Sequence, residues 1–126
     1  MKKLFTILFC CLVLFGCKKN IFDYRSKFLG NYNFSVHESA WTIYGQTLDT
    51  SYSYNGTISY GKSGDKSLTI NYSEKVSTEA ILYEDGSIKF SYLSGEFEST
   101  KKIRFKAEYQ GLGGGTASYV TGEKTK

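Results

Sequence analysis

Residues 52–60 read Tyr-Ser-Tyr-Asn-Gly-Thr-Ile-Ser-Tyr, and this stretch decides the fold class. Its even-numbered positions carry tyrosine, glycine or isoleucine, whereas its odd-numbered positions carry only serine, asparagine or threonine. Successive side chains of a β-strand point to opposite faces, so the segment has one apolar and one polar face. One-sided strands of this kind are typical of antiparallel sheets that are solvated on a single face. The stretch therefore predicts an all-β domain.

The turn after this strand is predicted at residues 62–65, Lys-Ser-Gly-Asp. A hairpin around it aligns two alternating strands, so its register can be written down in advance. The predicted inner pairs are Tyr60–Leu68, Ile58–Ile70 and Gly56–Tyr72, the last with an aromatic ring covering a strand glycine.

A second hairpin is indicated by Asp85-Gly86, because both central positions of a type I′ turn need positive φ. A two-residue turn there predicts the inner pairs Tyr83–Ile88 and Ile81–Phe90. Glu79 has the same phase as these residues, so we expect it at the rim of the interior. A third hairpin around Thr100 predicts one inner pair and two outer opposite-charge pairs. These are Phe97–Ile103 inside, and Glu98–Lys102 and Glu96–Arg104 outside.

The remaining strands lie at the two ends of the domain. The first begins at Gly30 and points Tyr32, Phe34 and Val36 inward. It has a bulge or bend near Ser39 and continues through Trp41 and Ile43. After a glycine-rich loop at 111–115, residues 116–122 form a last strand through Ala117 and either Tyr119 or Val120. The count is about eight antiparallel strands with short connections. Such a meander must bury its apolar faces against one another, as a closed up-and-down barrel or a sandwich, and the short hairpins favour the barrel.

The N-terminus reads as an export signal. Lys2 and Lys3 precede a twelve-residue apolar stretch, 4–15, which is too short to span a bilayer. It ends in Leu14-Phe15-Gly16-Cys17, which resembles the lipobox of a bacterial lipoprotein signal in its looser Bacteroidota form. The resemblance implies cleavage after residue 16 and acylation of Cys17. An ordinary secretory signal with incidental cysteines is the alternative.

The cysteines agree with this interpretation, since Cys10, Cys11 and Cys17 all lie at or before the expected cleavage point. The chain then divides into a signal (1–16), a lipidated tether with a short helical turn over 21–29 (17–29), and a β-domain (30–126). Lys18 is not the aspartate that retains lipoproteins at the inner membrane, and an acidic surface-export run is missing. We expect a lipid-anchored protein of the outer membrane that faces the periplasm.

The opening and closing segments carry a family resemblance. Gly30-Asn31-Tyr32 resembles the Gly-x-Trp that opens lipocalins, with tyrosine in place of tryptophan, and 111–121 resembles the closing segment of small Bacteroidota lipoproteins. The chain thus resembles Bacteroidota-type lipoproteins with a lipocalin-like β-barrel. That resemblance implies a fold and a location more than a chemistry.

The composition and the motifs indicate neither a catalytic site nor a nucleic-acid binding protein. Of 126 residues, 17% are aromatic, which is too many for a disordered tail. The net charge of +4 falls to +2 once Lys2 and Lys3 are removed, which is too small for a nucleic-acid binder. His37, the only histidine, falls on a polar strand face. Glu96 and Glu98 share a face, but predicted cationic partners keep both ionised. We expect no catalytic residue, no metal and no cofactor.

The inward tyrosines are the remaining candidates for a site, because a buried hydroxyl needs a hydrogen-bond partner. The residues expected to face a ligand in the interior are Tyr52, Tyr54, Tyr60, Tyr72, Tyr92, Tyr109 and Glu79. A filled aromatic core is the alternative to such a cavity.

Three functions follow in order of preference. The first is a non-enzymatic binding or interaction module that meets a partner in the envelope. The second is a lipocalin-like carrier of a small apolar or amphiphilic ligand. The third is an inhibitor of an envelope-attacking hydrolase, acting through exposed loops at 45–50 or 110–116.

Overall fold

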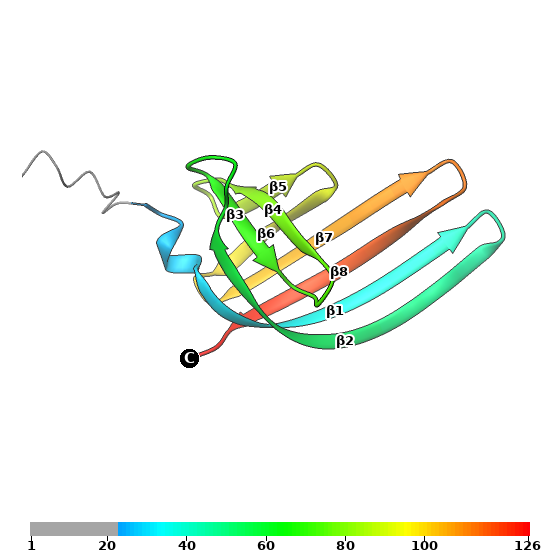
Figure 1. The fold of residues 1–126 in the computed structure, drawn as a ribbon, viewed down its shortest axis with the longest axis horizontal. Helices are drawn as coiled ribbons and strands as arrows, with labels where there is room; N and C mark the ends of the chain where they lie inside the picture. Colours follow the sequence, from blue (N-terminus) through cyan, green and yellow to red (C-terminus); the bar gives the residue numbers. More distant parts are fainter. Residues whose placement is uncertain (1–22) are drawn as a thin grey trace, which may run out of the picture.

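The computed structural model describes residues 23–126, so Cys17 and the signal lie outside the described residues. Eight antiparallel strands form a closed up-and-down barrel, in which each strand pairs with its sequence neighbours and β8 pairs with β1 (Figure 1). The elements are η1 (Ser26–Phe28), β1 (Gly30–Thr42), β2 (Gly45–Tyr60), β3 (Ser67–Asn71), β4 (Ser77–Leu82), β5 (Ser87–Phe90), β6 (Leu93–Ser99), β7 (Lys102–Gly111) and β8 (Gly114–Lys124). The predicted barrel is confirmed.

The first strand has the predicted inward phase, with Tyr32, Phe34 and Val36 buried. The bulge or bend predicted near Ser39 is a β-bulge, with its register shift between Ala40 and Trp41 and Thr47 of β2 as the extra residue. A bulge adds one unpaired residue and increases the local twist. The strand ends at Thr42, so the expected continuation through Ile43 is wrong, and Ile43 lies in the turn.

The β2–β3 hairpin has the predicted register, with Ile58 opposite Ile70 and Tyr60 opposite Leu68. Pairing ends at Asn71, so Tyr72 does not sit in the ladder opposite Gly56 as expected. The glycine is required for a different reason. A Cβ at Gly56 would lie 1.8 Å from the Asn71 carbonyl oxygen, so the two backbones approach too closely for any side chain.

The β4–β5 register predicted across Asp85-Gly86 is wrong by one residue. Leu82 lies opposite Ile88, and the Tyr83 amide donates to the Ser87 carbonyl at 2.9 Å. The loop therefore has three residues, 84–86, and ends in Gly86 at φ +88°, the conformation of a glycine bulge. A one-residue slip moves every side chain to the other face. The buried residues of β4 are accordingly Ala80 and Leu82, not Ile81 and Tyr83.

The β6–β7 hairpin confirms two of its three predicted pairs, Phe97–Ile103 and Glu96–Arg104. A register shift between Phe97 and Ser99 sets Ser99, not Glu98, opposite Lys102. Glu98 contacts Arg104 instead, and Lys102 pairs with Glu123 on β8 at 3.4 Å.

The last strand is longer than predicted, because the β7–β8 turn consists only of Leu112 and Gly113. Val120 faces inward between Val36 and Phe105. Ala117 and Tyr119 have the opposite phase to Val120; Ala117 is nevertheless buried, whereas Tyr119 is half exposed.

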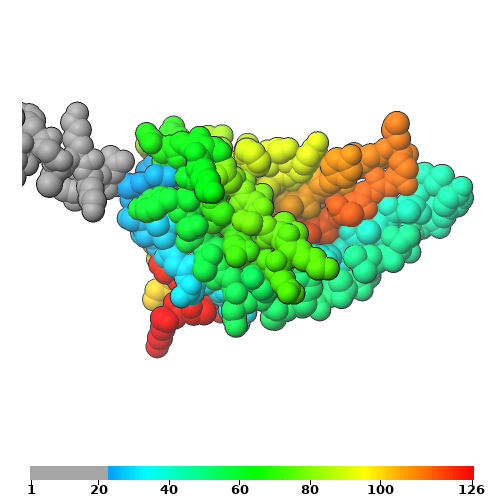
Figure 2. All heavy atoms as spheres, in the orientation of Figure 1, coloured from blue at the N-terminus to red at the C-terminus, as the bar shows by residue number. Residues whose placement is uncertain are grey.

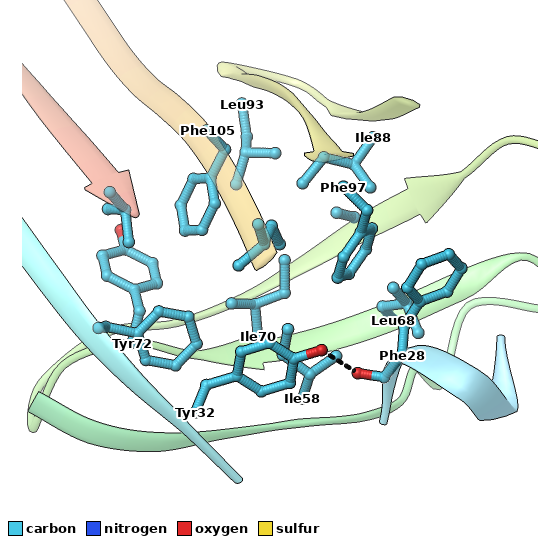
Figure 3. Packing of buried hydrophobic residues seen from close by; sticks show 14 of the residues in the cluster. Phe28, Tyr32, Ile58, Leu68, Ile70, Tyr72, Ile88, Leu93, Phe97 and Phe105 are labelled. Carbon is cyan, nitrogen blue, oxygen red and sulfur yellow. Dashed lines mark hydrogen bonds between the residues drawn. The ribbon is translucent and has the colours of Figure 1, made fainter. Parts of the chain in front are cut away.

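Side chains fill the barrel body, and η1 closes one end of it. Phe28 packs on Phe97 with ring centroids 4.1 Å apart, and its carbonyl accepts a 2.6 Å hydrogen bond from the Tyr32 hydroxyl (Figure 3). Arg25 is also buried there, where it donates to the Ser67 carbonyl at 2.8 Å. The helix expected over 21–29 is therefore a single 3₁₀ turn within the described residues.

The barrel has strands of two very different lengths. β3 to β6 have four to seven residues, whereas β1, β2, β7 and β8 have ten to sixteen. The long β1–β2 and β7–β8 hairpins therefore extend past the body as an open four-stranded sheet, at the end opposite η1 (Figures 1 and 2). We call this part the extension. It comprises residues 38–54 and 107–118.

Candidate functional site

A shallow groove of about 710 Å³ crosses the outer face of β2, β1, β8, β7 and β6. Most of its lining residues point away from the core. They alternate with the buried residues of their own strands, and the register sets them opposite one another across neighbouring strands. Its lining includes five short hydroxyl side chains, namely Ser35, Ser51, Ser53, Ser94 and Thr121. The groove therefore offers many neutral hydrogen-bonding groups on a rigid sheet.

His37 is the centre of a hydrogen-bonded group at the β2 side of the groove. Its Nδ1 lies 2.7 Å from the Ser51 Oγ, and its Nε2 lies 3.1 Å from an Asp49 carboxylate oxygen. The β1–β2 register produces this arrangement, since Ser51 lies directly opposite His37 and Asp49 is two residues away on the same face. The group was missed from the sequence because no β1–β2 register was predicted. The alternation of Asp49, Ser51 and Ser53 together with a turn at 43–44 would have been the available signal.

The residue types of this group are those of a catalytic triad, but its environment differs from that of a hydrolase site. The side chains of His37 and Asp49 are 47% and 58% exposed. Water therefore screens the attraction between these two side chains. Ser51 lies in an extended strand rather than on a strained turn. The group is suited to donating and accepting hydrogen bonds at the groove surface.

The cations of the groove are each held by carboxylates. Arg104 contacts Glu96 and Glu98, and the hydrogen bond from Arg104 to Glu96 raises the pKa of the guanidinium above its ordinary value. Lys106 pairs with Glu108, which raises the pKa of that ammonium, and it also lies 5.1 Å from the centre of the Tyr119 ring. The groove margin is thus charged but locally neutral, with a half-exposed aromatic ring beside it.

The expected interior residues do not gather into one cavity. Tyr72 is buried in the core, where its ring meets Phe105 edge-on at 5.2 Å. Burial raises the Tyr72 pKa. Tyr60 has the inward phase but is half exposed, with the Arg25 guanidinium 4.6 Å from its ring centre. Glu79 lies outward, since the register of β4 differs from the predicted one, and it accepts hydrogen bonds from the Lys62 amide and the Ser63 hydroxyl.

Four of the expected tyrosines lie toward the open extension. Tyr52 and Tyr54 are partly buried on the inner face of β2, and the Tyr52 hydroxyl donates to Glu38 at 2.7 Å. Burial, with a contribution from that hydrogen bond, raises the pKa of Tyr52 to about 12. Tyr92 and Tyr109 are exposed and pack edge-to-face at 5.3 Å. Tyr52, Tyr54 and Tyr109 lie on the inner face of the open sheet, whereas Tyr92 lies in the β5–β6 turn, so the four do not line a closed cavity.

Two further findings concern the described part of the chain alone. Residues 23–126 contain no group of three or more histidine, cysteine, aspartate or glutamate side chains placed to hold a metal ion. No helix in that range is long and apolar enough to cross a membrane.

Comparison of the chain with protein-family models, with curated proteins and with solved structures found no match.

Proposed function

We propose that this protein is an envelope lipoprotein, anchored in the outer membrane through acylated Cys17, whose barrel is a non-enzymatic binding module. The observation that carries the proposal is the groove on the outer face. Short neutral hydroxyl side chains are prominent in its lining, and its charged groups are already paired with carboxylates or with His37. Such a surface suits a polar partner that exchanges hydrogen bonds with it, rather than a reaction that needs an unpaired acid, base or nucleophile.

The position of the tether supports the same proposal. The described chain begins beside η1, at the end of the barrel opposite the two long hairpins (Figure 1). Sixteen strand residues at about 3.3 Å each make β2 roughly 50 Å long. An anchor at the η1 end therefore leaves the groove and the hairpin tips accessible to other components of the envelope.

The hairpin tips add apolar contact area of the kind that marks interaction sites. Tyr44 at the β1–β2 turn is 93% exposed, and Ile43 and Leu112 are also largely exposed. A carrier function, the alternative, is less favoured because core side chains occupy the barrel body. A carried amphiphile would have to lie against Tyr52 and Tyr109 on the inner face of the extension.

Site-specific photocrosslinking in intact cells tests the groove. Benzoylphenylalanine at Thr121 places the probe in the groove, and the same residue at Ser59, exposed on the outer face of β2 beyond the groove, is the matched control. We expect a crosslinked product from position 121 that is lost when Tyr119→Ala is added. Equal products from both positions would contradict the groove as the binding site.

Two further measurements separate the parts of the proposal. Cys17→Ser should release the protein from membranes, and unchanged fractionation would refute the anchor. Labelling of Ser51 by a serine-directed fluorophosphonate, or ester hydrolysis that Ser51→Ala abolishes, would refute the non-enzymatic function. Native mass spectrometry of the purified protein tests the carrier alternative, which requires added mass that disappears on denaturation.

A further inference from the structure

The end of the barrel at η1 brings together lysines from three segments that are far apart in the sequence. The Lys124 amide donates to the Lys101 carbonyl at 2.7 Å, and the Lys124 ammonium donates to the Lys27 carbonyl at 3.3 Å. These contacts join the end of β8 to the β6–β7 turn and to η1 (Figures 1 and 2). Lys126 follows two residues after Lys124. We call Lys27, Lys101, Lys124 and Lys126 the lysine cluster.

The lysine cluster concentrates positive charge on a domain whose net charge is zero. Four of the 16 lysines and arginines precede residue 23, whereas all 12 aspartates and glutamates lie within 23–126, so this range has as many cations as carboxylates. The neighbouring cations Arg25 and Lys102 are paired with Asp23 and Glu123. No cluster lysine forms an ion pair with a carboxylate of residues 23–126, and all but the partly exposed Lys124 are exposed.

The other charged side chains in the turns of this end do not reverse its sign. Asp65 shares the β2–β3 loop with Lys62 and Lys66, and Glu84 and Asp85 lie in the β4–β5 turn. These five side chains add one more carboxylate than cations, whereas the lysine cluster supplies four cations. Among the described residues, the η1 end is therefore net positive, and the compensating carboxylates lie elsewhere on the barrel.

The proposed acyl anchor brings this same end of the barrel to the membrane. Cys17 precedes Asp23 by six residues, and six residues of any conformation span at most about 20 Å. The described chain enters the barrel beside η1, so the lysine cluster stays close to the headgroups once Cys17 is in the bilayer. A tether this short gives an effective concentration on the order of millimolar, so a weak attraction is sufficient for contact. This step rests on the proposed function.

We propose that the lysine cluster binds anionic phospholipid headgroups of the membrane that holds Cys17. An anionic surface attracts each nearby lysine, and the attraction decays within a Debye length, about 8 Å at physiological ionic strength. The acyl anchor and the cluster are then two attachments at one end of the barrel. A single tether lets the barrel turn in any direction, whereas two attachments hold η1 against the lipid. The extension, at the opposite end, is thereby directed away from the membrane.

Fluorescence quenching in reconstituted vesicles tests the proposal on the lipidated protein. A thiol-reactive fluorophore is placed at Ser26→Cys, exposed in η1, or at Leu112→Cys, exposed in the β7–β8 turn, as the control. The vesicles are phosphatidylcholine alone, or equal parts phosphatidylcholine and phosphatidylglycerol, each with a nitroxide-headgroup lipid as quencher. We expect the label at 26 to be quenched at least about twofold more in the anionic vesicles. The difference should disappear in about 1 M salt, where the Debye length is about 3 Å. The label at 112 should respond equally in both.

Two charge-matched double variants identify the lysines responsible. Lys101→Gln with Lys126→Gln should lower the ratio of docked to undocked barrel about 20-fold, since each lysine near the surface contributes on the order of fivefold. Lys75→Gln with Lys89→Gln removes the same charge from exposed positions in the β3–β4 turn and β5, and should leave the quenching unchanged.

The outcomes separate this proposal from the anchor on which it rests. Equal quenching of the label at 26 in both kinds of vesicle, or equal effects of the two double variants, would overturn the lysine cluster and leave the anchor standing. The unsubstituted chain is the blank. If the fluorophore labelled Cys17 there, Cys17 would not be acylated, and both proposals would be overturned together.

Discussion

The barrel body and the extension are built partly from the same strands, yet one is a packed core and the other is exposed on both faces. β1 buries Tyr32, Phe34 and Val36 where β3 to β6 lie across the barrel, and the same alternation continues through Glu38 and Ala40, which are only partly buried. The two parts of β1 differ in whether other strands lie across the barrel from their inner face. Alternation therefore supplies a face that can be buried, and the lengths of the other strands determine how much of it is buried.

Truncating an aromatic side chain in the core should cause the largest loss of stability, and thus the clearest difference between the barrel body and the extension. Phe34 has no exposed surface, and its ring packs on Tyr32 with centroids 5.7 Å apart. We expect Phe34→Ala to lower the free energy of unfolding by about 3–5 kcal/mol, because it removes a buried ring and leaves a cavity. Urea denaturation of the purified domain measures this. A loss below about 1 kcal/mol would mean that the body is not a packed core.

Adding a single methyl group at the close approach of two backbones should lower the free energy of unfolding by a smaller amount. Gly56→Ala would place its Cβ against the Asn71 carbonyl oxygen, and backbone atoms cannot move aside cheaply. We expect Gly56→Ala to lower the free energy of unfolding, measured by urea denaturation, by about 1–3 kcal/mol. Gly113→Ala in the tip of the extension is the control, because a Cβ added there would have no neighbouring atom within 4 Å. Equal effects of the two substitutions would contradict the close approach of β2 to Asn71.

The buried tyrosine hydroxyl provides a pH-dependent test. Burial raises the pKa of Tyr32 to about 12 from an ordinary value of 10.0. The folded state therefore favours the neutral phenol. The resulting stabilisation is complete below the unfolded pKa and is lost as the pH rises through the folded value. Urea midpoints measured at increasing alkaline pH should fall more steeply for the natural chain than for Tyr32→Phe. Parallel curves would show that Tyr32 ionises freely.

The smallest effect is expected in the extension. Tyr109 has the inward phase of β7 but is 54% exposed, and its main partner is the Tyr92 ring. We expect Tyr109→Ala to cost no more than about 1.5 kcal/mol, the upper value for an aromatic pair beyond its burial. Thermal denaturation alongside Phe34→Ala makes the comparison directly. If Tyr109→Ala were as destabilising as Phe34→Ala, the extension would have to be part of the core.

Local patterns were sufficient for the strand count, the turns and most of the inward phases. The predicted register was correct across the β2–β3 turn, as at Tyr60–Leu68, and correct in part across the β6–β7 turn, where Phe97–Ile103 forms but Glu98–Lys102 does not. The predicted registers failed where one residue more or less in a loop or bulge changes the face. The three-residue loop at 84–86 is the clearest example, since it exchanged Ile81 for Leu82 in the core and turned Glu79 outward.

Local sequence patterns predicted the candidate site less well than they predicted the fold. The groove joins residues from five strands, and its central group joins His37 with Asp49 and Ser51 across a register that only the folded hairpin shows. Tyrosines chosen for a shared phase were divided between the core and the open extension, because phase alone does not say whether another strand covers the face.

The sequence by itself determined that the domain consists of alternating antiparallel strands joined by tight turns, since these features depend on neighbouring residues and on the backbone angles that each turn requires. Only the tertiary structure decided where the barrel is covered, that an outer groove forms across β6, β7, β8, β1 and β2, and that residues 46–54 of β2 pair on one side only among the described residues. These features depend on strand lengths, bulges and loop lengths that act together. Each pairing aligns residues far apart in the chain, and a shift of one residue anywhere moves a whole strand to its other face.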